Sequence, residues 1–440
     1  MTGISTDTRP FCFIIPVWGA SYCQKMVDRC LPSLLAANNF PLLNASDGHR
    51  FVIATTAEDC RQIEHLPVMA RISRHVTISY IEIPTPEVAG YAGVIRHLSR
   101  CLKLLFDAAY ADRSYCSFVM PEQIFSDGVV ASMLRSVANG DHLLLATGLR
   151  QVEEDVLSDL ANRNILTKDS ALSMNAEALT ISPRLIADLC VRYLHPEAIA
   201  YAESARSPIA RPPFRFWLLG KERGLILRTF FAHPILMDFS VVPADHTRCL
   251  EQGDFESDYL GYAFAASARS GKIRVVTDSD ECMILSPTPG SVDHTRDWLM
   301  FRRIGARLMP RLALIADIRN ATLAYVRNYN DPVRLETFRN SVRWHAVDID
   351  DAWQREEADI QDIVTQAAGD YYADPTRFPS RFRSNPRYWL IDAFSLAQYL
   401  LRYVYALQLV FAALAGNAEE RLILKLRLSA LASRYFSRGK

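Results

Sequence analysis

Short apolar runs alternate with longer amphipathic stretches through the first 150 residues, and this alternation limits most strongly what the chain can fold into. Five runs are typical of strands covered on both faces: residues 11–17, 51–54, 76–83, 116–120 and 142–147. Between them apolar residues recur every three or four positions, as in helices with one buried face. Strands that alternate with such helices predict βαβ units. We therefore expect an α/β fold, a Rossmann-type mainly parallel sheet with helices on both faces.

One of these strands has an acidic residue at its end. Residues 116–120 are followed by Pro121 and Glu122, and an amphipathic helix is expected over 127–138. Open α/β sheets bind their ligands at the carboxyl ends of the strands. Glu122 is therefore the first candidate for metal or phosphate chemistry. A solvated loop acid, or a charge near a helix N-terminus, is the structural alternative.

Length and composition indicate a globular chain with two domains. The 440 residues exceed the roughly 250–300 that a single core serves, and half of them are hydrophobic. After residue 290 the strand pattern gives way to long amphipathic stretches. We expect a nucleotide-binding and catalytic domain over residues 1–290 and a helical domain over 291–440. Basic and acidic residues number 49 each, which argues against a nucleic-acid partner.

The cysteines and the N-terminus favour a cytoplasmic protein. The nine cysteines are an odd number, lie within apolar runs and show no C-x-x-C spacing. This usage is typical of reduced cysteines in a core. The first ten residues, MTGISTDTRP, lack the basic and apolar regions of a signal peptide.

The segment 393–416 is long and apolar enough to raise the question of a membrane. Its 24 residues include one charged residue, Arg402, and are also interrupted by Gln398 and Gln408. An Arg in a membrane span is costly, so a buried helix of the helical domain is the favoured interpretation. Peripheral contact with the inner face of the membrane, or a homodimer through the C-terminal helices, are the alternatives.

Several common enzyme motifs are absent from the sequence. There is no G-x-S-x-G, no G-x-x-x-x-G-K, no H-E-x-x-H and no G-x-G-x-x-G after the first strand. Serine hydrolases, P-loop enzymes and dinucleotide-binding enzymes therefore lose support. The segment PVWGASY holds a single glycine, which also disfavours a nucleotidyltransferase or a methyltransferase.

The order of elements resembles the nucleotide-sugar-binding half of a GT-A glycosyltransferase. The likeness is carried by FIIPVWG, FVIATTAED, a helix with Arg96 and YCSFVMPEQIFSDGVVASML, and it covers roughly residues 10–290. In that family a strand ending in an Asp-x-Asp-type motif brings a divalent metal to the donor diphosphate. The resemblance implies a GT-A-like fold and a glycosyltransferase that moves a sugar from a nucleotide-diphosphate-sugar donor to a glycan or cell-envelope acceptor, as in polysaccharide biosynthesis.

The resemblance also implies which residues contact the donor. An indole beside a glycine at the first strand end can stack on a base or sugar while the backbone approaches the ligand. Arginines would bind the phosphates if no metal does so, with Arg150 as a further candidate. The expected donor contacts are Pro16, Trp18, Gly19, Thr55, Thr56, Arg96, Pro121 and Arg215.

The chain departs from the family at the metal motif. The sequence Met-Pro-Glu-Gln offers Glu122 as a single carboxylate where two acids are usual. Mg²⁺ or Mn²⁺ can be bound by few protein carboxylates when the phosphates supply the other ligands. The resemblance makes His233 the distal metal ligand, although a hydrogen-bonded core histidine would look the same. Asp278 and Asp280, with literal D-x-D spacing, are the alternative metal ligands.

An inverting transfer needs a carboxylate that accepts the proton of the acceptor hydroxyl. The acidic loop before Tyr259 supplies two candidates, Asp258 first and Glu256 second. A degenerate, non-catalytic glycan-binding or scaffolding protein is the alternative to an enzyme.

Overall fold

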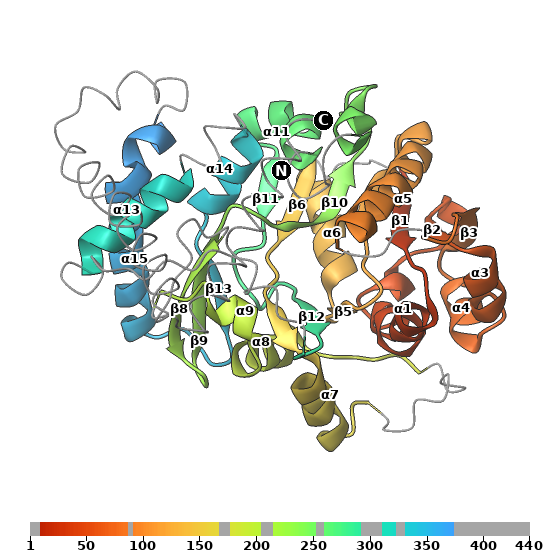
Figure 1. The fold of residues 1–440 in the computed structure, drawn as a ribbon, viewed down its shortest axis with the longest axis horizontal. Coiled ribbons are helices and arrows are strands. Elements are labelled where there is room, and N and C mark those ends of the chain that lie inside the picture. Colours follow the sequence, from red (N-terminus) through yellow and green to blue (C-terminus); the bar gives the residue numbers. More distant parts are fainter. Residues whose placement is uncertain are drawn as a thin grey trace, which may run out of the picture. The chain divides into compact units, whose positions relative to one another are not determined.

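The computed structural model describes residues 9–86, 91–166, 177–203, 214–251, 259–291, 310–322 and 331–373. Glu256, Asp258 and the segment 393–416 lie outside these residues. Contacts divide the chain into two compact units (Figure 1). The first unit comprises Met1–His195, Leu218–Gly290 and Tyr325–Ile349, and the second comprises Pro196–Trp217, Ser291–Ala324 and Asp350–Lys440.

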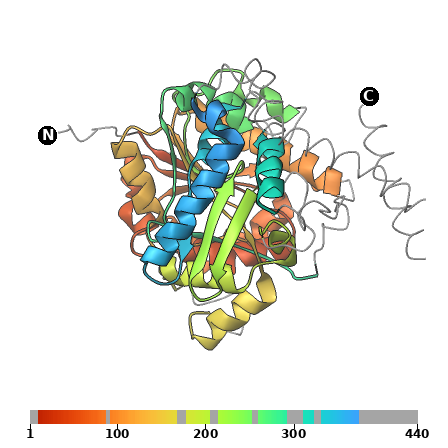
Figure 2. The ribbon, with the colours of Figure 1, turned by 90° about the vertical axis from the view of Figure 1, so that its left-hand side faces the viewer.

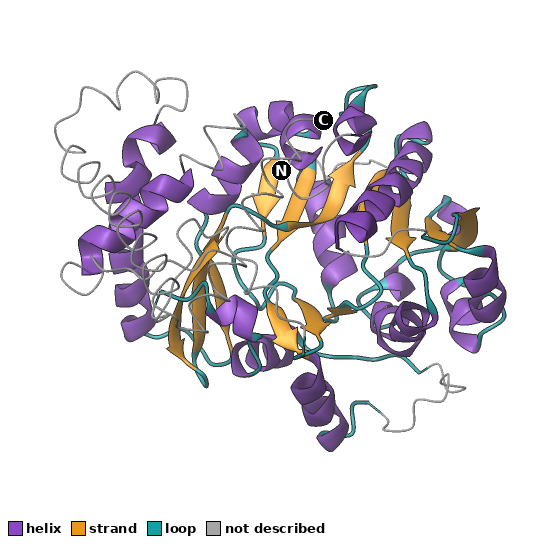
Figure 3. Cartoon of the chain, in the orientation of Figure 1, coloured by secondary structure: helices purple, strands orange, loops and turns teal. Residues whose placement is uncertain are grey.

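The first unit is built on a seven-stranded sheet with the order β11-β6-β10-β4-β1-β2-β3. Figure 3 shows the strands in orange and the helices in purple. Six strands run parallel, and β10 runs antiparallel between β4 and β6. The strands are β1 (Phe11–Pro16), β2 (Arg50–Thr55), β3 (Thr77–Glu82), β4 (Tyr115–Phe118), β6 (Leu143–Ala146), β10 (His233–Asp238) and β11 (Ile273–Val275). The predicted α/β fold with a mainly parallel sheet is confirmed.

The direction in which successive strands are added to the sheet reverses at β1. From β1 the chain adds β2 and β3 on one side and then β4 on the other side. The loops that leave the carboxyl ends of β1 and β4 therefore diverge, which creates the switch point where open α/β sheets bind ligands. The loop after β1 starts at Val17, and the loop after β4 contains Glu122.

Helices pack around this sheet. In α5, for example, apolar residues at helical spacing pack against β1, β2 and β4. The longer helices of the unit are α5 (Tyr91–Ala111), α6 (Val129–Ala138), α7 (Glu153–Asn162), α8 (Pro183–Arg192) and α14 (Pro332–Arg339). Shorter ones are η2 (Phe40–Leu42), η3 (Ala45–Asp47), α3 (Ala57–Ile63), α4 (Pro67–Ile72), η4 (His246–Glu251), α10 (Leu260–Ala263) and α11 (Ala265–Arg269).

The helix after β1 is interrupted, as Pro32 predicts. It runs as α1 (Ala20–Lys25), then as a π-helical turn, η1 (Met26–Cys30), and then as α2 (Leu31–Leu34). The N–H of Leu31 donates to the carbonyl of Met26, five residues earlier. Pro32 has no N–H to donate, and its ring crowds the preceding turn. The wider turn leaves Arg29 buried.

Two small sheets extend the first unit. In one, β12 (Ile284–Thr288) pairs with β5 (Ile124–Phe125) and β7 (Arg150–Val152), so it joins the segments that follow β4 and β6. In the other, the order is β13-β9-β8. Its strands are β13 (Val342–His345), β9 (Gly224–Thr229) and β8 (Phe214–Gly220), and β8 crosses the boundary of the two units at Trp217.

The described part of the second unit is mainly helical. It contains α9 (Pro196–Ile199), α13 (Pro310–Thr322) and α15 (Asp351–Ala373), and α13 packs against α15 (Figure 2). Arg311 on α13 pairs with Asp359 and Asp362 on α15, at 3.2 and 2.8 Å. Among the residues that the structure describes, no helix combines the length and the apolarity that a bilayer span requires.

Candidate functional site

The ends of β1 and β2 are held together by Asp59. Thr56 caps α3: its Oγ1 accepts from the Asp59 N–H at 3.1 Å and donates to Asp59 Oδ2 at 2.8 Å. The N–H of Gly19 donates to the same Asp59 Oδ2 at 2.9 Å. Gly19 has a φ of 82°, a conformation that glycine adopts without strain. The backbone after β1 is thus fixed in place beside Thr55 and Thr56.

Trp18 lies against helix α5 rather than against the helix that follows it. Its ring meets the ring of His97 edge to face, with 4.8 Å between the centroids and an angle of 84°. Burial, with a smaller contribution from Arg100, lowers the pKa of His97, so the imidazole is held neutral. Trp18 itself is half-buried and Gly19 is exposed.

Four buried polar side-chain atoms without a hydrogen-bond partner lie near the carboxyl edge of the sheet. They are Thr55 Oγ1 (β2), His97 Nε2 (on α5, beside Trp18), Glu122 Oε2 (after β4) and Thr147 Oγ1 (after β6), and nine further such atoms lie elsewhere among the described residues. Leaving a buried polar group unpaired costs about 1–3 kcal/mol. A polar ligand at this edge of the sheet would supply partners for these four atoms.

Glu122 lies in the turn after β4, at the switch point. Its side chain is partly exposed, but its Oε2 is enclosed. Burial raises the pKa of Glu122, and the positive charges of Lys25, Arg150 and Arg29 oppose the rise without cancelling it. A carboxyl group in this state exchanges a proton more readily near neutral pH than an exposed one.

The predicted partner of Glu122, His233, makes a different contact. Its ring nitrogen Nε2 lies 2.8 Å from the carbonyl oxygen of Phe118, so Nε2 must donate. Burial lowers the pKa of His233 to about 4, so the ring stays neutral. With its proton on Nε2, that nitrogen cannot ligate a metal. The geometry favours a hydrogen-bonded core histidine.

Three potential metal ligands meet after β11. Ligand atoms of Asp278, Asp280 and His345 all lie within 4.8 Å of one another, and among the described residues they form the only such group of three. The Nδ1 of His345 donates to the carbonyl of Val347 at 2.9 Å, which points Nε2 at Asp278 Oδ1, 2.8 Å away. Two acceptors do not face each other stably, so a proton or a shared cation must lie between them.

This donor set fits a divalent cation. Two carboxylates and one imidazole, with the second imidazole nitrogen held by a carbonyl, are ligands suited to Mn²⁺ and related ions. Burial would raise the pKa of Asp278, but hydrogen bonds from His345 and from the N–H of Asp280 hold it below its usual value. The carboxylate is therefore ionised, and a cation shared with His345 would have to replace the proton between Nε2 and Asp278 Oδ1.

Arginines balance the two carboxylates. Arg184 binds both oxygens of Asp280, at 2.9 Å from Nε and from Nη2, and also pairs with Asp348 at 2.7 Å. Arg343 lies 3.5 Å from Asp278. Arg184 and Asp280 are both about two-fifths exposed, so this ion pair is weak and can exchange for a metal ion.

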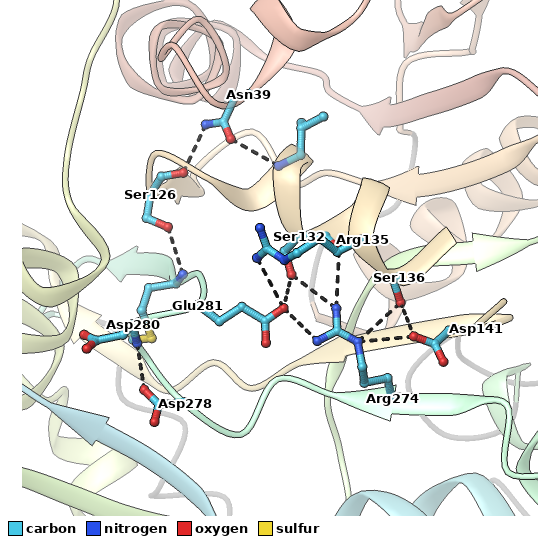
Figure 4. A network of polar contacts seen from close by, with 12 residues as sticks. Asn39, Ser126, Ser132, Arg135, Ser136, Asp141, Arg274, Asp278, Asp280 and Glu281 are labelled. Carbon is cyan, nitrogen blue, oxygen red and sulfur yellow. Dashed lines mark hydrogen bonds and ion pairs between the residues drawn. The ribbon is translucent and has the colours of Figure 1, made fainter. Parts of the chain in front are cut away.

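Glu281, the third acid of this segment, does not share the site. It turns to the other side of the loop and pairs with Arg274 at 2.7 Å, while Arg274 also contacts Asp141 at 3.2 Å (Figure 4). Ser132 on α6 donates to Glu281 as well. This network ties β11 to α6 and so fixes the position from which Asp278 and Asp280 project.

A small recess lies beside the metal-ligand group, at the carboxyl ends of β6 and β11. Thr147 and Asp278 contribute polar groups to its lining, and Val342 and Trp344 of β13 also border it. The recess is far too small to enclose a nucleotide sugar.

The other predicted site residues lie apart. Arg96 is exposed on α5, and Arg150 is exposed at the start of β7. Arg215 is 1% exposed, belongs to the second unit and pairs with Asp317 at 3.4 Å. Pro16 and Pro121 are buried in the ends of their segments.

Among known proteins, the matches to this chain are solved structures. No family model and no curated protein matches the chain. It is similar to TarS 1–349 from S. aureus, with 10% identity and a TM-score of 0.30 over 96% of this chain and 91% of that one. A longer TarS structure matches over 32% of this chain and 22% of that one, with 12% identity and a TM-score of 0.21.

A further similar structure is the mannosyltransferase PcManGT from Pyrobaculum calidifontis, in complex with GDP-Man and Mn²⁺. The identity is 11% and the TM-score is 0.26, over 98% of this chain and 87% of that one. At these identities and TM-scores the likeness assigns no donor, acceptor or metal to this chain.

Proposed function

We propose that the chain is a GT-A-like glycosyltransferase that moves a sugar from a nucleotide-diphosphate-sugar donor to a glycan or cell-envelope acceptor. The observation that carries the proposal is the row of four buried polar atoms without partners along the carboxyl edge of the sheet, on both sides of the switch point. A nucleotide sugar is a long ligand with hydrogen-bonding groups in the base, ribose, diphosphate and sugar. It can therefore satisfy polar atoms that several strand ends present.

The proposed orientation of the donor follows from the residue types. Trp18 and Thr55, at the ends of β1 and β2, offer a ring face and a hydroxyl to the nucleoside. Thr147 and Glu122, after β6 and β4, offer a hydroxyl and a carboxyl group to the sugar. The diphosphate then lies between them, near the switch point.

Asp278, Asp280 and His345 are the residues that would hold Mn²⁺ or Mg²⁺, and Glu122 is the alternative carboxylate. A divalent ion held by these three residues would lie beside Thr147, at the sugar end of the proposed donor, whereas one held by Glu122 would lie at the diphosphate and would neutralise its charge. The task of the chain is to orient His345 through Val347 and to keep Asp278 ionised. For the proton of the acceptor hydroxyl we propose Asp258, with Glu256 as the second candidate.

Release of nucleoside diphosphate from a panel of nucleotide sugars, with and without Mn²⁺, tests the proposal. We expect one donor class to be turned over in a metal-dependent way. Asp278→Asn should lower the rate at least tenfold and weaken Mn²⁺ binding by a factor of about 10–100, the usual effect of disturbing a metal site. Asp107→Asn, which removes an exposed acid paired with Lys103, is the matched control and should leave both unchanged.

A non-catalytic glycan-binding or scaffolding protein is the second candidate. It is favoured by the single carboxylate after β4 and by Arg184, which binds the carboxylate of Asp280. In that case no donor is turned over, and Glu122→Ala leaves the cellular function intact. Metal-dependent turnover that is lost in Asp278→Asn rules this candidate out.

A further inference from the structure

We propose that Lys25 and Arg29 form a binding subsite for a phosphate or diphosphate group, and that the carboxylate of Glu153 occupies this subsite in the structure. The inference rests on the proposed function, since the donor diphosphate is the anion that the subsite would take. It assigns a phosphate-binding role to residues outside the metal-ligand group.

The contacts of Glu153 are those that a phosphate group would make. Its Oε2 lies 2.7 Å from Lys25 Nζ, and its Oε1 pairs with Arg29 Nη2. One anion thus bridges an ammonium and a guanidinium through two oxygens. Both cations bind phosphate oxygens in the same manner, and Arg does so with paired N–H groups.

Arg29 has capacity for more than this one contact. Its side chain is 6% exposed, and its Nη1 is buried without a hydrogen-bond partner among the described residues. A guanidinium that lies deep in the protein normally satisfies its donors. A phosphate has more acceptor oxygens than a carboxylate and can reach Nη1 as well as Nη2.

The subsite lies at the switch point. The π-helical turn η1 carries Arg29, and the thiol of Cys30 next to it lies 3.6 Å from the carbonyl of Met120 in the turn after β4. The charges of Lys25, Arg29 and Arg150 all act on Glu122 in that turn. These groups come from the segments after β1, β4 and β6, which are the strand ends that border the crevice.

The subsite of Lys25 and Arg29 is accessible to solvent on the side of α1. Lys25 Nζ lies 5.6 Å from the ring centroid of Tyr22, which is 48% exposed. Lys25 keeps 16% of its side chain exposed. Glu153 is the first residue of α7, so a rotation of its side chain suffices to release the two cations to an incoming anion with a larger charge.

Inorganic pyrophosphate is the probe, with the full chain, in EDTA, by isothermal titration calorimetry. Glu153→Gln removes the competing charge, so we expect pyrophosphate to bind at least tenfold more tightly than it binds the unchanged protein. The double variants Glu153→Gln/Arg29→Gln and Glu153→Gln/Lys25→Gln should lose this gain. Glu154→Gln changes the neighbouring acid, which accepts from the Gly290 N–H, and should bind as the unchanged protein does.

A thermal unfolding transition shows for each variant that it is folded. In the Glu153→Gln/Arg29→Gln variant, neither side chain of the buried Arg29–Glu153 pair carries a charge. If Glu153→Gln is folded and binds pyrophosphate no more tightly, Glu153 is only a tie between α7 and the helix after β1, and the inference fails. Because the probe contains no nucleoside, sugar or metal, the result is independent of donor turnover. Tighter pyrophosphate binding without turnover of any nucleotide sugar would support the subsite and contradict the glycosyltransferase proposal.

Discussion

Glu122 shows how one residue can be unfavourable for folding and valuable for function. Its Oε2 is enclosed without a partner, and burial raises the pKa of the carboxyl group against the pull of three nearby cations. A group whose pKa is raised on folding makes its full contribution to the stability of the folded state below the pKa of the unfolded chain. That contribution is lost as the pH rises through the higher pKa of the folded state.

Glu122→Gln tests this view of the residue. Glutamine has nearly the same shape and no charge, so the variant avoids the cost of ionising a buried carboxyl group. We expect the free energy of unfolding of Glu122→Gln, relative to the unchanged protein, to be larger at pH 7.5 than at pH 4. Urea unfolding at both pH values measures it.

Glu122→Gln should also bind the nucleotide-sugar donor more weakly than the unchanged protein does. Gain of stability with loss of function is common where a binding site keeps an unfavourable group. An equal difference in unfolding free energy at both pH values would show that the Glu122 carboxyl group is solvated in the protein.

The sequence could nominate Asp278 and Asp280 as potential metal ligands, but it could not nominate His345, which the structure places beside them. Asp278 and Asp280 are adjacent in the sequence and show D-x-D spacing. His345 lies 67 positions from Asp278 and reaches it because β13 pairs with β9 and bridges to Asp278. Local periodicity contains no information on such pairing. His233 followed a recognisable pattern, and its contact with Phe118 could not be predicted from that pattern.

At the scale of elements, the start of α3 connects fold and site. Thr56 caps the helix and holds Asp59, and Asp59 in turn accepts from the Gly19 N–H at the end of β1. A Thr before an acidic first turn is a usual helix start, and Thr56 before Glu58 and Asp59 has this pattern. The cap therefore stabilises α3 and fixes the backbone beside Trp18 at once.

Thr56→Ala should lower the free energy of unfolding by about 1 kcal/mol, within the usual range for loss of a helix cap. It should also weaken nucleotide binding, because Gly19 loses a fixed partner. Thr56→Ser keeps the hydroxyl and is the matched control in both chemical unfolding and binding titrations. Equal stability of Thr56→Ala and Thr56→Ser would show that the cap contributes nothing.

Helices with a strong hydrophobic periodicity lie where the sequence predicts them. The pairing of strands that are far apart in the sequence could not be predicted. Helix α6 ends at the predicted residue, Ala138, and begins two residues after the predicted start. Strand β10 enters the middle of the sheet in the antiparallel direction. The sequence gives no sign of this, because the apolar run Pro234–Met237 does not indicate which strands it will pair with.

At the scale of the whole molecule, the claim is that one edge of the seven-stranded sheet binds a nucleotide sugar. The features that support it come from residues between Trp18 and His345, all within the first unit. They are the switch point, the row of buried polar atoms without partners and the metal-ligand group. The sheet brings these features to a common edge, which no single segment of the chain could do.

The most direct measurement is a crystal structure of the protein with a nucleoside diphosphate and Mn²⁺. We predict the nucleoside beside Trp18 and Thr55, the diphosphate at the switch point near Arg29 and Glu122, and Mn²⁺ between Asp278, Asp280 and His345. Binding of the nucleotide at any other surface would contradict the proposed donor site. So would crystals that show neither nucleotide nor metal after soaking at millimolar concentration.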